Sequence, residues 1–93
     1  MDIMPTRLVP SPDALARELN GEILLLDLRT SHYFGLTGTS ARIWELVEAG
    51  ESTGAIGDIL AREFDADESL IKEEVTRFLD DLVARGLLIA APA

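Results

Sequence analysis

Residues 29–47 contain the side chains of this chain that are best suited to chemistry. The stretch holds the only histidine, His32, and three of the five aromatic side chains, which are Tyr33, Phe34 and Trp44. A histidine can serve as a general base or as a metal ligand, but either role needs partner residues. The chain has no cysteine and no second histidine, so the metal-binding patterns H-x-x-H and H-E-x-x-H are absent. We therefore predict no catalytic residue, no metal site and no enzyme, with His32 as a strand or turn residue.

Two pairs of carboxylates are the next candidates for acid–base chemistry. Glu73 and Glu74 are adjacent in the sequence, as are Asp80 and Asp81. On a helix, adjacent side chains point about 100° apart and do not converge on one site. We expect these carboxylates to form a solvated face.

The charge balance argues against several classes of partner. The chain has 17 acidic and 8 basic residues, for a net charge of −9, and no basic patch stands apart from the carboxylates. Such a surface repels nucleic acids. The first ten residues do not resemble a signal peptide, and no apolar run is long enough to span a bilayer. We expect a cytoplasmic protein with no cofactor, no nucleic-acid partner and no membrane partner.

The first third of the chain predicts three strands after a proline-rich arm over residues 1–12. Residues 13–20 fit either a helix or the first strand of a hairpin, and Asn20-Gly21, the strongest short hairpin signal, favours the strand. Residues 22–30 form an apolar run of strand length. After a turn at residues 30–31, residues 32–36 predict a third strand, in which Gly35 suggests a bulge or a close backbone approach.

The remaining residues predict three helices. The first is expected to be capped by Thr39 or Ser40 and to end at Ala49, the second to begin at Ser52 or Thr53, and the third to run from its cap Asp67 to Arg85. Gly50 and Gly86 are expected just beyond two of these helix ends. Residues 87–90 fit a short strand or a packed tail. The predicted inward-facing residues are Ile43, Trp44, Val47, Ile56, Ile59, Leu60, Phe64, Ile71, Val75, Phe78, Leu79 and Leu82.

Three strands followed by three helices predict an α+β domain of winged-helix type. This architecture allows an alternative function as a DNA-binding regulator whose third helix enters a major groove. The exposed positions of that helix are largely acidic, however, and phosphate contacts supply much of the affinity in such complexes.

The predicted third strand lacks the usual protections of a sheet edge. Residues 31–36 contain no lysine, no proline and no charge. An extended peptide can add to such an edge as a further strand. A tail of the chain or a second copy of it could cover the same edge instead. By strand alternation His32, Phe34 and Leu36 share one face, and we expect Leu36 and Trp44 in the core and a structural role for Tyr33.

Two long stretches carry a family resemblance. "EILLLDLRTSHYFGLTGTSARIWELVEAGES" and "IGDILAREFDADESLIKEEVTRFLDDLVARGLL" resemble the PqqD-like family. The shared pattern is an apolar strand ending in "LD", then Tyr33 with Leu36, then a small-residue stretch leading to Ile43-Trp44. It continues through an acidic "EFDAD" loop to a long helix that closes on "GLL". The likeness covers residues 13–89, and the usual Asn after Leu36 is replaced by Thr37.

The resemblance implies a specific function. The family comprises peptide-recognition domains for ribosomally made, modified peptides, including coenzyme PQQ synthesis protein D and stand-alone proteins of lasso-peptide gene clusters. They fold as three antiparallel strands and three helices, bind the leader of a precursor peptide and present it to a maturation enzyme. That enzyme is a radical-SAM enzyme, or a leader peptidase acting with a cyclase. Residues 13–90 would form this domain, and residues 13–20 its first strand.

The resemblance also implies where the leader binds. It adds as a strand to the third strand and lies in the cleft between that strand and the third helix. The matching positions are Ser31, His32, Tyr33, Phe34, Gly35, Leu36, Lys72, Val75, Thr76, Leu79 and Val83. From the strand-addition model we also expect proline at Phe34 to remove a pairing donor and weaken binding.

Overall fold

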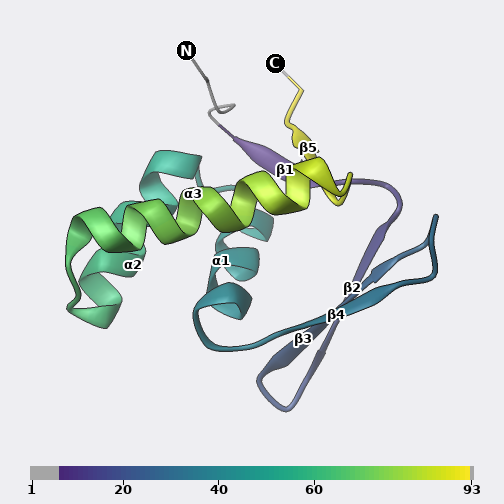
Figure 1. The fold of residues 1–93 in the computed structure, drawn as a ribbon, viewed down its shortest axis with the longest axis horizontal. Helices are drawn as coiled ribbons and strands as arrows, with labels where there is room; N and C mark the ends of the chain where they lie inside the picture. The colour runs from purple at the N-terminus through teal and green to yellow at the C-terminus, as the bar shows by residue number, and fades with distance from the viewer. Residues whose placement is uncertain (1–6, 93) are drawn as a thin grey trace.

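The structure is a computed structural model that describes residues 7–92. In chain order its elements are β1 (Leu8–Pro10), β2 (Ala14–Leu19), β3 (Glu22–Asp27), β4 (Tyr33–Leu36), α1 (Gly38–Glu48), α2 (Thr53–Phe64), α3 (Glu68–Ala84) and β5 (Leu88–Ala90). Strands β2, β3 and β4 form an antiparallel sheet, which projects from one side of the three helices (Figure 1). The predicted α+β class and the order of a three-stranded sheet and three helices are confirmed.

The hairpin between β2 and β3 settles the ambiguity of residues 13–20 in favour of a strand. Leu19 pairs with Glu22, which leaves Asn20 and Gly21 as a two-residue loop. Both loop residues have positive φ, 54° and 82°. A type I′ turn requires this conformation at both positions, and its twist matches that of the flanking strands.

The connection from β3 to β4 is longer and leaves β4 regular. The N–H of Ser31, which has a φ of 64°, donates to the carbonyl of Asp27 at 2.8 Å. Beyond this turn the register runs without interruption, and Leu24 lies opposite Gly35. The predicted bulge at Gly35 is therefore wrong. Within residues 7–92 nothing approaches Gly35 closely either, because a Cβ there would meet no described atom within 4 Å.

The arm predicted to be irregular contains a strand. β1 pairs with β5, so that Leu8 lies opposite Ala90, and the N–H of Ser11 donates to the carbonyl of Leu87 at 2.9 Å. The Leu8 side chain is buried in the core. The expectation is therefore wrong for residues 8–10, because a partner almost eighty positions away supplies their hydrogen bonds. Residues 1–6 of the arm lie outside the described part of the chain.

The helix starts follow the capping rules, with one shift. Ser52 and Asp67 cap α2 and α3 as predicted, since their side chains accept the backbone N–H of Ala55 and Leu70. The cap of α1 is Thr37, two or three residues before the predicted Thr39 or Ser40; Ser40 in its first turn accepts the N–H of Thr37 at 3.1 Å. Thr37 is thus a helix cap, a position that Asn also favours.

One hydrophobic core joins the helices to the inner face of the sheet. Trp44 and Leu36 are buried in it, as predicted. Phe64 is 45% exposed, which contradicts its predicted inward position. It is the last residue of α2. Periodicity places it on the face of Leu60, but periodicity cannot say how far along a helix the neighbouring elements reach.

Candidate functional site

The outer edge of β4 presents backbone hydrogen-bonding groups. The N–H of Asp27 donates to the carbonyl of His32 at 2.8 Å, which makes these two residues a hydrogen-bonded pair. Such pairs alternate with non-bonded pairs along antiparallel strands. The N–H and C=O groups of Phe34 therefore turn toward β3, whereas those of Tyr33 and Gly35 turn toward the outer edge. Among the described strands, none pairs with this edge.

This alternation corrects the expectation for proline at Phe34. The N–H of Phe34 belongs to the internal ladder, so proline there would disturb the pairing of β4 with β3. Removal of an outward donor requires a substitution at Tyr33 or Gly35 instead.

The side chains of β4 divide between two faces. Phe34 lies opposite the buried Leu25 and, like Leu36, faces the helices. Tyr33 faces away from them and is 70% exposed, which does not favour the expected structural role over contact with a ligand. His32 and Ser31, just before the strand, are exposed.

One flank of α3 faces β4. The guanidinium of Arg85, the C-cap residue of α3, lies 4.9 Å from the centre of the Phe34 ring. It also forms an ion pair with Asp81 at 3.0 Å. One turn further back along α3 lies a pocket of about 420 Å³, which we call the α1–α3 pocket. Its lining residues are Thr39, Ser40, Ile43, Glu74, Arg77, Phe78 and Asp81.

The α3 residues predicted for the site lie elsewhere on the helix. Four of them, Lys72, Val75, Thr76 and Leu79, line a second pocket, between α2 and α3, in which Val75 and Leu79 are largely buried. Lys72 pairs with Asp58 of α2 at 3.1 Å. Val83 is exposed and follows Lys72 by eleven residues, which is three helical turns, so it shares that flank.

Sequence reasoning missed the flank that faces β4. The missed residues are Glu74, Phe78, Asp81 and Arg85. Periodicity identifies the buried face of a helix. It does not say which of the two flanks beside that face lies next to β4. Only the packing of α3 against the rest of the fold decides between them.

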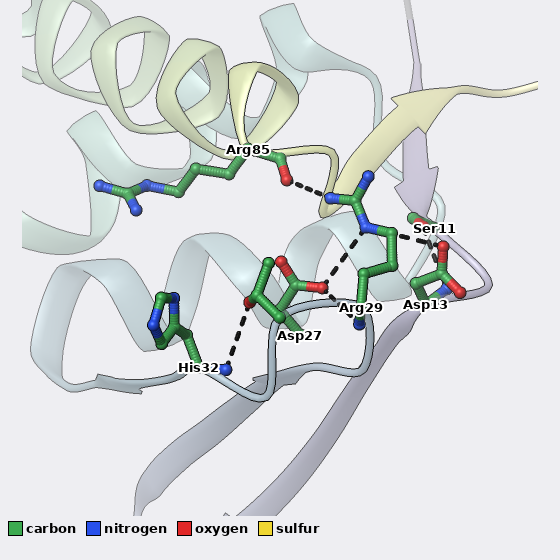
Figure 2. A network of polar contacts seen from close by, with 7 residues as sticks. Ser11, Asp13, Asp27, Arg29, His32 and Arg85 are labelled. Atoms are coloured by element: carbon green, nitrogen blue, oxygen red, sulfur yellow. Dashed lines mark hydrogen bonds and ion pairs between the residues drawn. The ribbon is translucent and has the colours of Figure 1, made fainter.

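Arg29 fastens the β3–β4 turn to the end of α3 (Figure 2). Its Nη2 donates to the carbonyl of Arg85 at 2.6 Å, and its backbone N–H donates to Oδ1 of Asp27 at 3.0 Å. Its Nε lies 3.5 Å from Asp27 and 3.8 Å from Asp13. Gly86, at a φ of 76°, follows directly, and a Cβ there would collide with the Arg29 guanidinium. We call these contacts the Arg29 bracket; they hold the start of β4 next to the end of α3.

The bracket changes the titration of Asp27. Burial would raise the pKa of this carboxyl group. Hydrogen bonds from the backbone and guanidinium of Arg29, the charge of Arg29 and a hydrogen bond from Thr30 outweigh burial and lower the pKa below its ordinary value. Asp27 is therefore a structural carboxylate that is ionised at neutral pH.

A serine motif that the histidine-centred reasoning overlooked also proves structural. Residues 50–54 read G-E-S-T-G, which fits the nucleophile-elbow pattern G-x-S-x-G. That pattern implies a strand-to-helix turn, whereas here Ser52 stands between two helices. Its Oγ accepts the N–H of Ala55 at 3.1 Å as the cap of α2. Within residues 7–92 no group of three or more potential ligands could hold a metal ion.

Comparison with known proteins decides the family. The family model of coenzyme PQQ synthesis protein D (PqqD) matches residues 22–88, most of the chain. The chain belongs to the PqqD family. No curated protein sequence matches this PqqD-family chain. None of its helices within residues 7–92 is long and apolar enough to cross a membrane.

Two solved structures share the fold of this PqqD-family protein. TbiB1, solved in complex with the TbiA(beta) leader peptide, is 29% identical, with a TM-score of 0.83 over 91% of this chain and 99% of its own. Lasso peptide synthetase B1, complexed with the leader peptide, is 19% identical, with a TM-score of 0.81 over 89% of this chain and 98% of its own.

Proposed function

We propose that this PqqD-family protein is a non-catalytic module that binds the leader of a ribosomally synthesised precursor peptide. The leader adds as a strand to the outer edge of β4 and is delivered to a separate maturation enzyme in the cytoplasm. That enzyme is a radical-SAM enzyme, or a leader peptidase acting with a cyclase. The similarity to TbiB1, a protein solved with a leader peptide, supports this proposal.

The observation that carries the proposal is the outward direction of the backbone groups of Tyr33 and Gly35. An added strand can pair with both residues. Its side chains opposite Phe34 and Leu36 would point toward the helices, because directly opposite residues share a face. There they would meet the α1–α3 pocket, where the partly buried Phe78 offers apolar surface.

The charge arrangement on α3 does not favour DNA binding. The basic side chains of this helix and its C-cap lie within ion-pair distance of carboxylates: Lys72 with Asp58 and Glu68, Arg77 with Glu73, and Arg85 with Asp81. These pairs leave little positive charge on α3 for a phosphate backbone.

The test uses a displayed library of random peptides of about twelve residues, selected against the full chain. Gly35→Pro removes one outward donor, and an edge strand tolerates proline where its N–H faces solvent. We expect this variant to weaken the selected peptides by roughly fivefold or more, since one backbone hydrogen bond contributes about 1 kcal/mol. Titration calorimetry measures the change.

Glu18→Pro on β2 is the matched control. Leu28 donates to the carbonyl of Asp13 at 2.9 Å, and the resulting alternation turns the N–H of Glu18 toward the free edge of β2. This variant should bind as the unchanged chain does. A library that yields no binder, or a folded Gly35→Pro variant with unchanged affinity, contradicts the proposal.

A further inference from the structure

Gly35 occupies a position at which the fold itself does not require glycine. Its φ lies outside the left-handed region, and a Cβ added there would meet no described atom within 4 Å. Glycine weakens a strand, because it costs backbone entropy and offers no side chain to pack. Neither backbone conformation nor packing within residues 7–92 explains its presence in the exposed edge strand.

The empty position belongs to the outer face of the sheet. Ile23 and Leu25 are buried against the helices, so their neighbour Leu24 points to the opposite face. Two rows of paired residues cross this face: Leu15, Leu26 and Tyr33 form one, and Arg17, Leu24 and Gly35 form the other. The second row ends at the β4 edge with Gly35, which has no side chain.

A shallow pocket of about 260 Å³ lies at this point, and we call it the Gly35 notch. Its lining residues are Leu19, Asn20, Glu22, Ile23, Leu24 and Gly35. Leu24 is 37% exposed and Leu19 is 62% exposed, so the notch has apolar walls that face solvent.

The register of an added strand determines what reaches the notch. Because the N–H and C=O of Gly35 point outward, one residue of the added strand pairs directly with Gly35. The side chain of that residue must lie on the outer face, next to the missing Gly35 side chain. Strands lie about 4.8 Å apart, so this backbone is about 10 Å from that of Leu24. A long side chain can span this separation only by crossing above the glycine.

We infer that the Gly35 notch is a specificity pocket for one large apolar side chain, aromatic or long aliphatic, at the peptide position paired with Gly35. This inference rests on the proposed function. The protein then contacts side chains of the bound peptide on both faces of the sheet. The side chains that point toward the helices contact the α1–α3 pocket, and the side chain of the residue opposite Gly35 contacts Leu24 and Leu19.

The experiment is a double-mutant cycle with the library-selected peptides as probes. Replacing the apolar residue opposite Gly35 by alanine should weaken binding to the unchanged chain about tenfold. Gly35→Leu fills the notch, and the open space around Gly35 predicts that this variant folds. Against Gly35→Leu the parent peptide and its alanine version should bind alike.

Leu24→Thr is a second variant that removes the apolar wall and keeps strand propensity. With this variant, too, the parent peptide and its alanine version should differ in affinity by less than tenfold. If Gly35→Leu does not fold, Leu24→Thr alone tests whether the notch binds the side chain. The inference is overturned if the selected peptides share no large apolar residue at one position. It is also overturned if the alanine substitution costs the same on all three proteins. If Gly35→Pro weakens binding but the alanine substitution costs the same on every variant, strand addition stands and the notch has no role. If no peptide binds at all, the proposed function itself fails.

Discussion

At the scale of single residues, the apparent chemical cluster of residues 29–47 separates into core residues and exposed residues of a sheet edge. Trp44 is buried between the helices and the sheet, Phe34 contacts Arg85, and Tyr33 faces solvent. His32 lies exposed before β4 and contributes its carbonyl oxygen to the β3–β4 pairing. These residues lie close together in the sequence because the chain passes there from an edge strand, β4, into the helix α1.

Trp44 allows a prediction about stability. Its indole N–H is buried with no hydrogen-bond partner among the described residues. Trp44→Ala should lower the free energy of unfolding by about 3–5 kcal/mol, through lost burial and a cavity. Trp44→Phe should cost clearly less, because it retains most of the ring contacts and removes a buried donor without a partner. Urea denaturation followed by circular dichroism measures both; equal losses would show that the N–H has a partner such as a bound water.

Asp27 allows a prediction about pH. Its pKa is lower in the folded chain than in the unfolded chain, so its contribution to stability is complete above the ordinary aspartate pKa. The contribution falls away as the pH drops below about 4, through the lowered folded value. Asp27→Asn should therefore show a smaller loss of stability between pH 4 and about 2 than the unchanged chain. Urea midpoints across this range test the expectation, and parallel curves would contradict it.

At the scale of elements, the proposed site depends on how β4 and α3 are held together. The two elements meet through Phe34 and Arg85, and the Arg29 bracket ties the turn before β4 to the end of α3. The α1–α3 pocket continues along the same flank of α3. An extended peptide that pairs with the β4 edge therefore has a helix flank on which to place its inward side chains.

Two neighbouring glutamates test which flank of α3 is used. Glu74 lines the α1–α3 pocket, whereas Glu73 is not among its lining residues and pairs at 2.9 Å with Arg77, which is one of them. Glu74→Arg places a long side chain at the pocket and should weaken library-selected peptides by roughly tenfold, about 1.4 kcal/mol. Glu73→Arg makes the same change of charge and serves as the control, with little expected effect. Equal affinities for both variants would place the peptide elsewhere.

At the scale of the whole molecule, contacts between residues distant in the sequence link the described elements. β1 joins β5, and Arg42 of α1 forms two hydrogen bonds with Glu63 of α2, at 2.9 and 2.7 Å. These bonds lower the pKa of the Glu63 carboxyl group, although burial opposes the shift. The family match begins at residue 22, so β1 and β2 lie outside it even though both contribute to the described fold.

The contribution of β1 to the fold can be measured at Leu8. Leu8→Ala should lower the free energy of unfolding by about 2–5 kcal/mol, because the side chain is fully buried. Val9→Ala is the matched control in the same strand; Val9 is only partly buried and should cost much less. Chemical denaturation at neutral pH separates the two. A negligible cost at Leu8 would mean that β1 contributes little to the core.

Local signals in the sequence determined the order and type of nearly all elements. The Asn20-Gly21 loop, the caps Ser52 and Asp67 and the stop at Gly86 act on their own neighbours, through backbone conformations and hydrogen bonds that need no distant partner. The unprotected edge over residues 31–36 was visible for the same reason, because its lack of charge and proline is a local property.

Tertiary structure alone decided the rest. The strand over residues 8–10 exists through its pairing with residues 88–90, and the flank of α3 that meets β4 depends on how that helix packs against the rest of the fold. The outward direction of the backbone groups of Tyr33 and Gly35 follows from the pairing of β4 with β3, whose alternation the hydrogen bond from Asp27 to His32 identifies. Contacts between residues far apart in the chain leave no periodic trace in the sequence, whereas caps and turns do. The sequence by itself therefore determined that the β4 edge is unprotected, and the packing decided which backbone groups face outward and which flank of α3 lies beside β4.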